Sequence, residues 1–206
     1  GLVVGEDLGT VPDYVRTVLG EHGLLGCMVE WFARVDDSPN AGDPYADPST
    51  YRKYALASVT THDLPPTAGY LQFEHVKLRE QLHLLSGPVE EFQASATAER
   101  DAMMDRLVES GLITPEVAGD VEGHIQEIVE AMHKMLLKSP SVLLRRPRLV
   151  AVGVAETRTQ NQPGTSSEYS NWRVPLAGPD LKVVHTDEVF DLPRVQSLAA
   201  IMNGEK

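Results

Sequence analysis

The stretch Tyr54-Ala-Leu-Ala-Ser-Val-Thr-Thr-His-Asp63 points most directly to the fold class of this chain. A short apolar run that ends in polar residues is typical of a buried strand. Similar runs occupy residues 2–5, which end at Glu6 and Asp7, residues 27–33, and a split run over residues 141–144 and 149–154. Stretches with helical spacing separate these runs, so the sequence predicts an α/β fold built from parallel βαβ units.

Two parts of the chain carry the helical pattern most clearly. Residues 10–21 are expected to form a helix with Thr10 as its N-cap, Pro12 in its first turn and Gly23 as its stop signal. Residues 72–138 are expected to form a helical insertion, because two sets of residues recur every three or four positions and each set lines one face of a helix. The sets are Leu71, His75, Leu78, Leu82 and Leu85, and Val117, Val121, Ile125, Ile128, Met132 and Met135.

Residues 145–148, Arg-Arg-Pro-Arg, interrupt the last of the apolar runs. Three unpaired arginines in a buried strand would be very costly. We therefore expect either that the strand is displaced at this point or that the stretch is an anomaly of the sequence.

Composition and charge exclude several classes of protein. The 206 residues carry 18 Lys and Arg against 30 Asp and Glu, a net charge of -12 that disfavours nucleic acid as a partner. With 42% hydrophobic residues the chain can bury a core, yet no apolar run approaches the ~20 residues that span a bilayer, so we expect no membrane partner. The single cysteine, Cys27, fits a reducing cytoplasm. The first residues do not form a signal peptide and look like the middle of a strand, so we expect the C-terminal part of a longer chain.

Acidic residues follow two of the expected strands. In parallel α/β architectures, catalytic groups gather at the carboxyl ends of the strands, where we expect Glu6 with Asp7 to meet His62 with Asp63. A pair of carboxyl groups over one pocket suits glycosidic bond chemistry, since one gives a proton to the leaving oxygen and another stabilises an oxocarbenium-like centre. The alternative is that these residues only cap the next helix or face water.

Other catalytic classes lack their signatures. The seven histidines show no H-E-x-x-H spacing and no pair of cysteines exists, so we expect no metal. His75 and His83 are expected on helix surfaces. No G-x-S-x-G, G-x-G-x-x-G or Walker stretch is present, which argues against a serine nucleophile and against a nucleotide. We therefore expect no metal or organic cofactor.

Residues 158–173 are rich in amides and hydroxyls and include one tryptophan, Trp172. Sugar rings are bound by this mixture, because polar groups contact the hydroxyls and an aromatic face contacts the C–H side. A solvated turn is the alternative, since Asn, Gly, Pro and Ser favour turns. Trp31, in the second run, is expected in the core.

The sequence strongly resembles the 4-alpha-glucanotransferases of glycoside hydrolase family 77, the amylomaltases or disproportionating enzymes. The matching segments are Val4-Gly-Glu-Asp-Leu-Gly9, Thr60-Thr-His-Asp63, Gln160-Asn-Gln-Pro-Gly-Thr165 and Asn171-Trp-Arg173, in the family's order. The resemblance implies a (β/α)8 TIM barrel of which residues 1–206 form a partial catalytic domain, with the N-terminal half of the barrel missing and residues 72–138 as a helical insertion.

The resemblance also implies a retaining transglycosylation that transfers a segment of α-1,4-glucan to an acceptor sugar. Glu6 matches the family's general acid/base, and Asp63 matches the carboxylate that stabilises the transition state. His62, Asp7 and Asn161 match positions that contact or lie close to the glucan. The nucleophilic aspartate would precede residue 1, so the resemblance implies that this chain alone does not catalyse the reaction. Maltooligosaccharide or α-glucan and a sugar acceptor are the implied partners.

Two other functions stay open on the sequence. One is an α-amylase-type hydrolase or a branching enzyme, which would share the carboxylates but release glucan to water or form 1,6 links. The other is a glucan-binding barrel fragment without catalysis. The products of maltotriose separate transfer from hydrolysis.

Overall fold

The computed structural model describes residues 1–144, 156–177 and 182–204. Its strands are β1 (Gly26–Val29), β2 (Ala55–Ser58) and β3 (Leu143–Leu144), and its α-helices are α1 (Asp13–Glu21), α2 (Thr67–Leu71), α3 (Glu74–Gln81), α4 (Val89–Glu109), α5 (Pro115–Gly119), α6 (Ile125–Leu136) and α8 (Pro193–Met202). Short 3₁₀ helices are η1 (Glu30–Phe32), η2 (Val35–Asp37), η3 (Pro48–Thr50) and η4 (Val189–Asp191).

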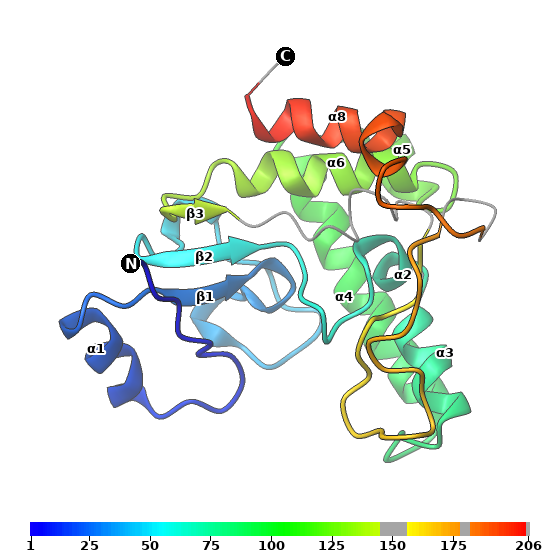
Figure 1. The fold of residues 1–206 in the computed structure, drawn as a ribbon, viewed down its shortest axis with the longest axis horizontal. Helices are drawn as coiled ribbons and strands as arrows, with labels where there is room; N and C mark the ends of the chain where they lie inside the picture. Colours follow the sequence, from blue (N-terminus) through cyan, green and yellow to red (C-terminus); the bar gives the residue numbers. More distant parts are fainter. Residues whose placement is uncertain (145–155, 178–181, 205–206) are drawn as a thin grey trace.

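The strands form one parallel sheet in the order β1-β2-β3 (Figure 1). Gly26 lies opposite Ala55 in the first pair, and β3 pairs with the other edge of β2. Val4 forms a parallel bridge with Leu25, directly before β1. The first run of the sequence therefore lies beside β1, on the side away from β2. The expected α/β class with parallel strands is confirmed in the described residues.

Strand β1 is shorter than the run 27–33 suggests. It ends at Val29, and Glu30–Phe32 form η1, closed by a hydrogen bond from the Ala33 N–H to the Glu30 carbonyl oxygen. An apolar run shows that residues are buried but does not show where the strand stops, because the 3₁₀ turn buries Glu30 and Trp31 equally well. Residues 145–148 and 149–154 lie outside the described residues.

Helix α1 ends where the sequence indicates, at Glu21, with Gly23 in a left-handed conformation (φ 65°) two residues later. Its start is three residues later than expected. Pro12 is the N-cap with φ -58° and ψ 141°, and no side chain caps the helix, so the expectation for Thr10 is wrong. A residue before proline avoids helical dihedrals, which keeps the preceding chain extended.

Residues 72–138 are helical, but neither apolar set lies on one continuous helix. Leu71 ends α2, and Phe73 takes a left-handed conformation (φ 62°) before α3 begins at Glu74. The second set is divided between α5 and α6 by residues 120–124. Periodicity detects a buried face, and it does not detect such breaks because the face continues across them.

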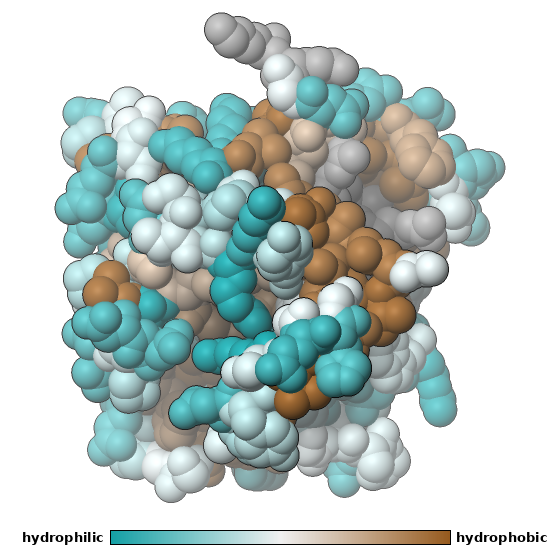
Figure 2. Space-filling model, turned by 90° about the vertical axis from the view of Figure 1, so that its left-hand side faces the viewer, coloured by the Kyte–Doolittle hydropathy of each residue, from teal (hydrophilic) through white to brown (hydrophobic). Residues whose placement is uncertain are grey.

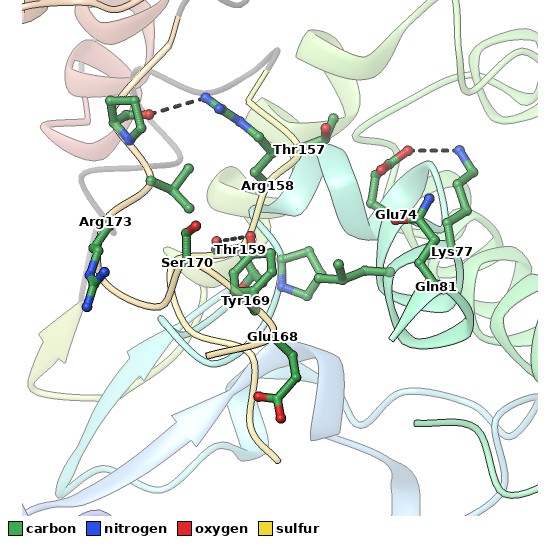
Figure 3. Close-up of a pocket in the computed structure, with 14 residues that line it drawn as sticks. Glu74, Lys77, Gln81, Thr157, Arg158, Thr159, Glu168, Tyr169, Ser170 and Arg173 are labelled. Atoms are coloured by element: carbon green, nitrogen blue, oxygen red, sulfur yellow. Dashed lines mark hydrogen bonds and ion pairs between the residues drawn. The ribbon is translucent and has the colours of Figure 1, made fainter. Parts of the chain in front are cut away.

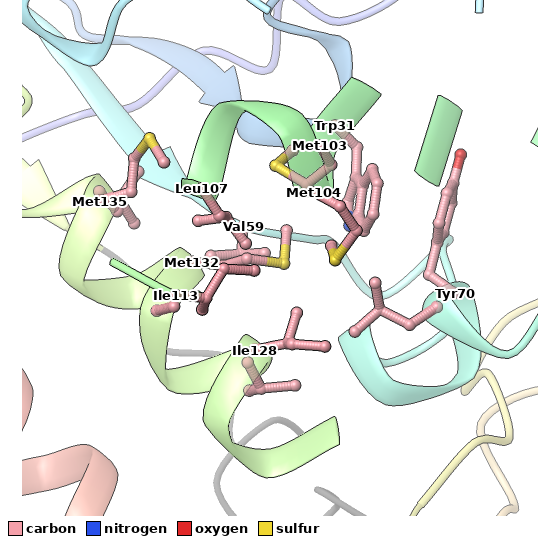
Figure 4. Close-up of a cluster of buried hydrophobic side chains, with 14 of the residues drawn as sticks. Trp31, Val59, Tyr70, Met103, Met104, Leu107, Ile113, Ile128, Met132 and Met135 are labelled. Carbon is pink, nitrogen blue, oxygen red and sulfur yellow. The ribbon is translucent and has the colours of Figure 1, made fainter. Parts of the chain in front are cut away.

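The hydrophobic core lies between the sheet and helices α4 and α6 (Figure 4). Met103, Leu107, Ile128 and Met132 are fully buried there, and Trp31 is 1% exposed, which confirms its expected place in the core. The Arg34 guanidinium donates a 3.0 Å hydrogen bond to Glu99 on α4. The helical region thus packs against the sheet rather than standing apart from it.

Figure 2 shows the side of the molecule where the N-terminus and the amino ends of the strands lie, with apolar side chains gathered in one region of it. Leu2, Val3 and Val142, which belong to or precede the outer strands, are exposed. No helix in the described ranges is long and apolar enough to cross a membrane.

Candidate active site

Three of the expected site residues meet at one oxygen atom, and we call them the Asp63 cluster: His62, Asp63 and Asn161. The Asn161 side-chain amide donates a 2.7 Å hydrogen bond to Oδ1 of Asp63. The Nε2 atom of His62 lies 3.2 Å from the same oxygen, and the His62 and Asp63 side chains are about one-third exposed (35% and 37%). A carboxylate that is fixed by an amide and an imidazole, yet open to solvent, can bind a polar or cationic group.

The position of this cluster follows from the end of β2. The strand stops at Ser58, Val59 and Thr60 stay buried, and the next three residues emerge at its carboxyl end. The Thr60 hydroxyl donates a 3.0 Å hydrogen bond to the Pro65 carbonyl oxygen, which closes the loop.

A second segment brings Asn161 to this loop. The Asn161 N–H donates to the His62 carbonyl oxygen at 3.2 Å, and the Thr159 hydroxyl lies 3.2 Å from the Leu64 carbonyl oxygen. Farther back, Gly69 of α2 meets the Thr157 backbone so closely that a Cβ there would lie 2.4 Å from the Thr157 carbonyl oxygen. A glycine at position 69 therefore sets how near the two segments approach.

The polar stretch that contains Asn161 is irregular over the described residues 156–177, as expected for turns. It is also held by its own side chains. The Asn171 side chain accepts a hydrogen bond from the Gln162 N–H and donates one to Thr165 Oγ1. The Trp172 ring lies with its centroid 5.1 Å from that of His62. The turn interpretation and the sugar-site interpretation are thus compatible.

Glu6 is exposed, and its strand does not adjoin β2. Val4 pairs next to β1, so β1 lies between the segment that carries Glu6 and the strand that leads to Asp63. Glu6 and Asp63 therefore do not follow adjacent strands, and their strands are separated by two strand spacings, about 10 Å. That both carboxylates face one sugar groove stays a prediction.

Asp7 is buried and fully engaged by protein groups. Its Oδ1 accepts a 2.7 Å hydrogen bond from the Cys27 N–H, and its Oδ2 lies 2.5 Å from Nη1 of Arg52. Burial raises the pKa of this carboxyl, but the Arg52 and Cys27 hydrogen bonds outweigh it and hold the pKa below its ordinary value. A Cβ at Gly26 would lie 2.6 Å from Nη1 of Arg52 and would displace the ends of the Arg52 and Asp7 side chains. A contact between Asp7 and a glucan stays a prediction.

Two pockets lie close to these residues. One, of about 480 Å³, is bounded by α3 and the polar stretch, including Glu74, Lys77, Arg158 and Tyr169 (Figure 3). The other, of about 750 Å³, is lined by Asp7, Cys27, Arg52 and neighbouring residues. None of Glu6, His62, Asp63 and Asn161 lines either pocket. Within the described part of the chain, no group of three or more His, Cys, Asp or Glu residues could hold a metal ion.

One histidine differs from its expected place. His83 is exposed beyond the end of α3, but His75 stacks on Tyr70 with ring centroids 4.2 Å apart. His75 is therefore half-buried against Tyr70, whereas the expectation placed it on the helix surface. Burial, with a smaller effect of the Arg79 charge, lowers the pKa of His75 to about 4.

Two residues that position the site, Arg52 and Gly69, were not predicted from the sequence. No local pattern singles out Arg52, because its partner Asp7 is 45 positions away. Gly69 carried a usable signal: glycine in a helix is unfavourable, so its presence suggests a close approach by another backbone.

These features define an α/β protein with parallel strands and a carboxylate-centred site on the loops at their carboxyl ends. The family model for 4-alpha-glucanotransferases, glycoside hydrolase family 77, matches residues 1–181. The chain belongs to this family.

Individual relatives agree with this assignment. A 4-alpha-glucanotransferase of Mycobacterium bovis is 48% identical over 198 residues, covering 96% of this chain and 26% of the relative. The crystal structure of amylomaltase from Corynebacterium glutamicum superposes with a TM-score of 0.87 at 32% identity, covering 98% of this chain and 28% of that one. Amylomaltase from Streptococcus agalactiae in complex with acarbose shares the fold, with a TM-score of 0.52 at 16% identity over 96% of this chain and 30% of that one. The chain thus spans about a quarter of the length of the relatives it matches.

Proposed function

We propose that this chain is part of a 4-alpha-glucanotransferase that breaks an α-1,4-glucan bond and passes the glucanosyl unit to an acceptor sugar with retention. Family membership supports the reaction class. The observation that carries the proposal for this chain is the Asp63 cluster, in which residues from two separate matching motifs share one carboxylate oxygen.

In this proposal Asp63 stabilises the positively charged, oxocarbenium-like transition state. The hydrogen bond from Asn161 and the contact with His62 fix the carboxylate before substrate arrives, so little reorganisation accompanies the charge that develops. His62 and Asn161 are about as accessible as Asp63 and would also contact the sugar. Both carboxylate oxygens of Asp7 already accept hydrogen bonds, from the Cys27 N–H and from Arg52. A direct contact with glucan would need one of these oxygens to accept a further hydrogen bond.

Glu6 would protonate the leaving glycosidic oxygen and then accept the proton of the incoming sugar hydroxyl. A retaining mechanism also needs a carboxylate nucleophile about 5 to 5.5 Å from this acid/base, which we assign to a segment outside residues 1–206. That segment would extend the parallel sheet into a (β/α)8 barrel, with residues 72–138 as a helical insertion. The parallel order from Val4 to β3 supports such a barrel.

The substrates would be maltooligosaccharides or other α-glucans. The acarbose complex of the Streptococcus agalactiae amylomaltase supports a sugar-like ligand in this fold. The net charge of -12 supports a neutral substrate over a polyanion. The proposed reaction uses these carboxylates and needs no metal or organic cofactor.

The test uses a chimera: the Mycobacterium bovis relative with its matching segment replaced by this chain. With maltotriose, we expect glucose and longer oligosaccharides. Glu6→Gln and Asp63→Asn should each reduce transfer about 100-fold or more while maltooligosaccharide still binds. The matched controls are Glu21→Gln and Asp105→Asn, which change exposed acids on α1 and α4.

Shorter sugars alone would instead favour the hydrolase alternative. Full transfer by Glu6→Gln or Asp63→Asn would refute the assigned roles.

A further inference from the structure

Trp172 is held in a conformation that disfavours a large side chain. Its φ is 62°, in the left-handed region, and the residue is 63% exposed. Bulky residues rarely adopt positive φ, and an exposed indole leaves apolar surface in water. The other tryptophan of the chain, Trp31, is 1% exposed and stacks on Tyr70. Packing explains Trp31 but not Trp172.

The surrounding hydrogen bonds fix this conformation on both sides. The Trp172 N–H donates to the Gln160 carbonyl oxygen at 2.7 Å, and the Arg173 N–H donates to the Ser170 carbonyl oxygen at 3.0 Å. The Asn171 side chain, directly before Trp172, accepts a hydrogen bond from the Gln162 N–H. Strain that persists because the neighbours over-determine it is a feature of functional sites.

The Trp172 ring is held beside the Asp63 cluster. The ring centroids of Trp172 and His62 are 5.1 Å apart with an angle of 40° between the planes, and Nε2 of His62 contacts Oδ1 of Asp63. The backbone bond to Gln160 also links the tryptophan to the residue before Asn161. An open aromatic face thus lies beside a carboxylate, an imidazole and an amide.

We infer that Trp172 is a stacking platform for a glucose ring of the α-glucan whose neighbouring unit engages Asp63. The C–H face of the sugar packs on the indole, and its hydroxyls reach the polar groups of the cluster. This inference rests on the proposed function and adds a specificity-determining residue to it. A ring that binds the sugar equally in the ground and transition states changes KM more than kcat.

The test compares three variants in the chimera: Trp172→Ala, Trp172→Phe and Trp172→Gly. Glycine suits the left-handed backbone, so Trp172→Gly removes the ring without adding strain and should melt no lower than the wild type. We expect Trp172→Gly and Trp172→Ala to raise KM for maltotriose about tenfold with little change in kcat, and Trp172→Phe to restore most of the affinity. Phe190→Ala, an equally exposed aromatic residue on η4, is the matched control.

The outcomes separate the two proposals. If the unsubstituted chimera makes no transfer products, the proposed function fails. If it transfers, and Trp172→Gly folds with KM within twofold of the wild type, the stacking role is wrong while the function stands. A lower melting temperature for Trp172→Gly with unchanged KM would assign the ring a purely structural role and would also overturn the inference.

Discussion

The Asn161 side-chain amide and Oδ1 of Asp63 are joined by a 2.7 Å hydrogen bond across 98 positions of sequence. Asp63 follows β2, and Asn161 lies on the irregular stretch of residues 156–177. Because the amide donates to one carboxylate oxygen, it fixes the orientation of the Asp63 side chain. The bond therefore connects the two motifs in chemistry as well as in space.

Asn161→Ala in the chimera should lower kcat/KM for maltotriose about 10- to 100-fold, since a hydrogen bond to a charged group contributes about 1.5 to 3 kcal/mol. Asn161→Asp should lower it further and make the rate more dependent on pH, because two adjacent carboxyl groups do not ionise together easily. Kinetics over a range of pH measure both effects. Asn203→Ala, at an exposed position, is the control. Rates within twofold of the wild type for both Asn161 variants would show that the bond is not needed.

Gly69→Ala should destabilise the chain by about 1 to 3 kcal/mol. The added Cβ would lie 2.4 Å from the Thr157 carbonyl oxygen, and this backbone atom cannot move aside as the end of a side chain can. In the chimera it should also reduce transfer, since Thr157 leads directly to Asn161. Urea unfolding and maltotriose kinetics measure the two effects. Gly20→Ala, in α1 with nothing within 4 Å, is the control and should be neutral or slightly stabilising. Equal stability of the two alanine variants would contradict the close approach.

Glu30→Gln should make the chain more stable than the wild type at high pH. Burial raises the pKa of the Glu30 carboxyl to about 8, with the Arg106 charge opposing it, and neither Glu30 oxygen has a hydrogen-bond partner among the described residues. The folded state therefore holds the proton more tightly than the unfolded state. Its stabilising effect is complete below about pH 4.5 and is lost as the pH rises to about 8, a change of about 3 to 5 kcal/mol.

Urea unfolding of the wild type and of Glu30→Gln at pH 5 and pH 9 measures this difference. Glu122→Gln, at an exposed position between α5 and α6, should leave the pH dependence as it is. The same loss of stability between pH 5 and pH 9 in wild type and Glu30→Gln would contradict the prediction.

His75→Phe should protect the chain against acid. The folded pKa of His75 is about 4, lowered mainly by burial, and the ordinary value is 6.5, so the folded state favours the neutral ring. The resulting stability is present above pH 6.5 and is lost as the pH falls towards 4, a change of about 3 kcal/mol. Phenylalanine keeps the stacking on Tyr70 and removes the titration. Unfolding curves at pH 7 and pH 4 compare the variant with wild type and with the exposed-site control His185→Phe; a variant as acid-sensitive as wild type would refute the role of His75.

The sequence predicts much of the sheet because apolar runs mark buried strands directly. The runs that contain Ala55–Ser58 and Gly26–Val29 form parallel strands in the described residues, and Trp31 is buried. The ends of the elements were harder to predict. The apolar character of Trp31 continues past the last residue of β1, and the left-handed Phe73 interrupts a periodic face without changing its spacing.

The candidate site was predictable in its residue types, and the structure brings His62, Asp63 and Asn161 together. Strand order was not predictable from the spacing of Glu6 and Asp63, because sequence separation does not say which strand lies between two others. Partners such as Arg52 for Asp7 depend on contacts across 45 positions, which no local pattern encodes.

The burial of Asp7 has a consequence for its neighbour. Asp7 is buried and Glu6, directly before it, is exposed, so the two neighbouring acids face opposite ways. The hydrogen bonds of Asp7 to the Cys27 N–H and to Arg52 thereby set the direction of the side chain before it, that of the proposed proton donor. Inserting or deleting one residue between Val4 and Asp7 would turn the proposed acid/base inward in place of Asp7.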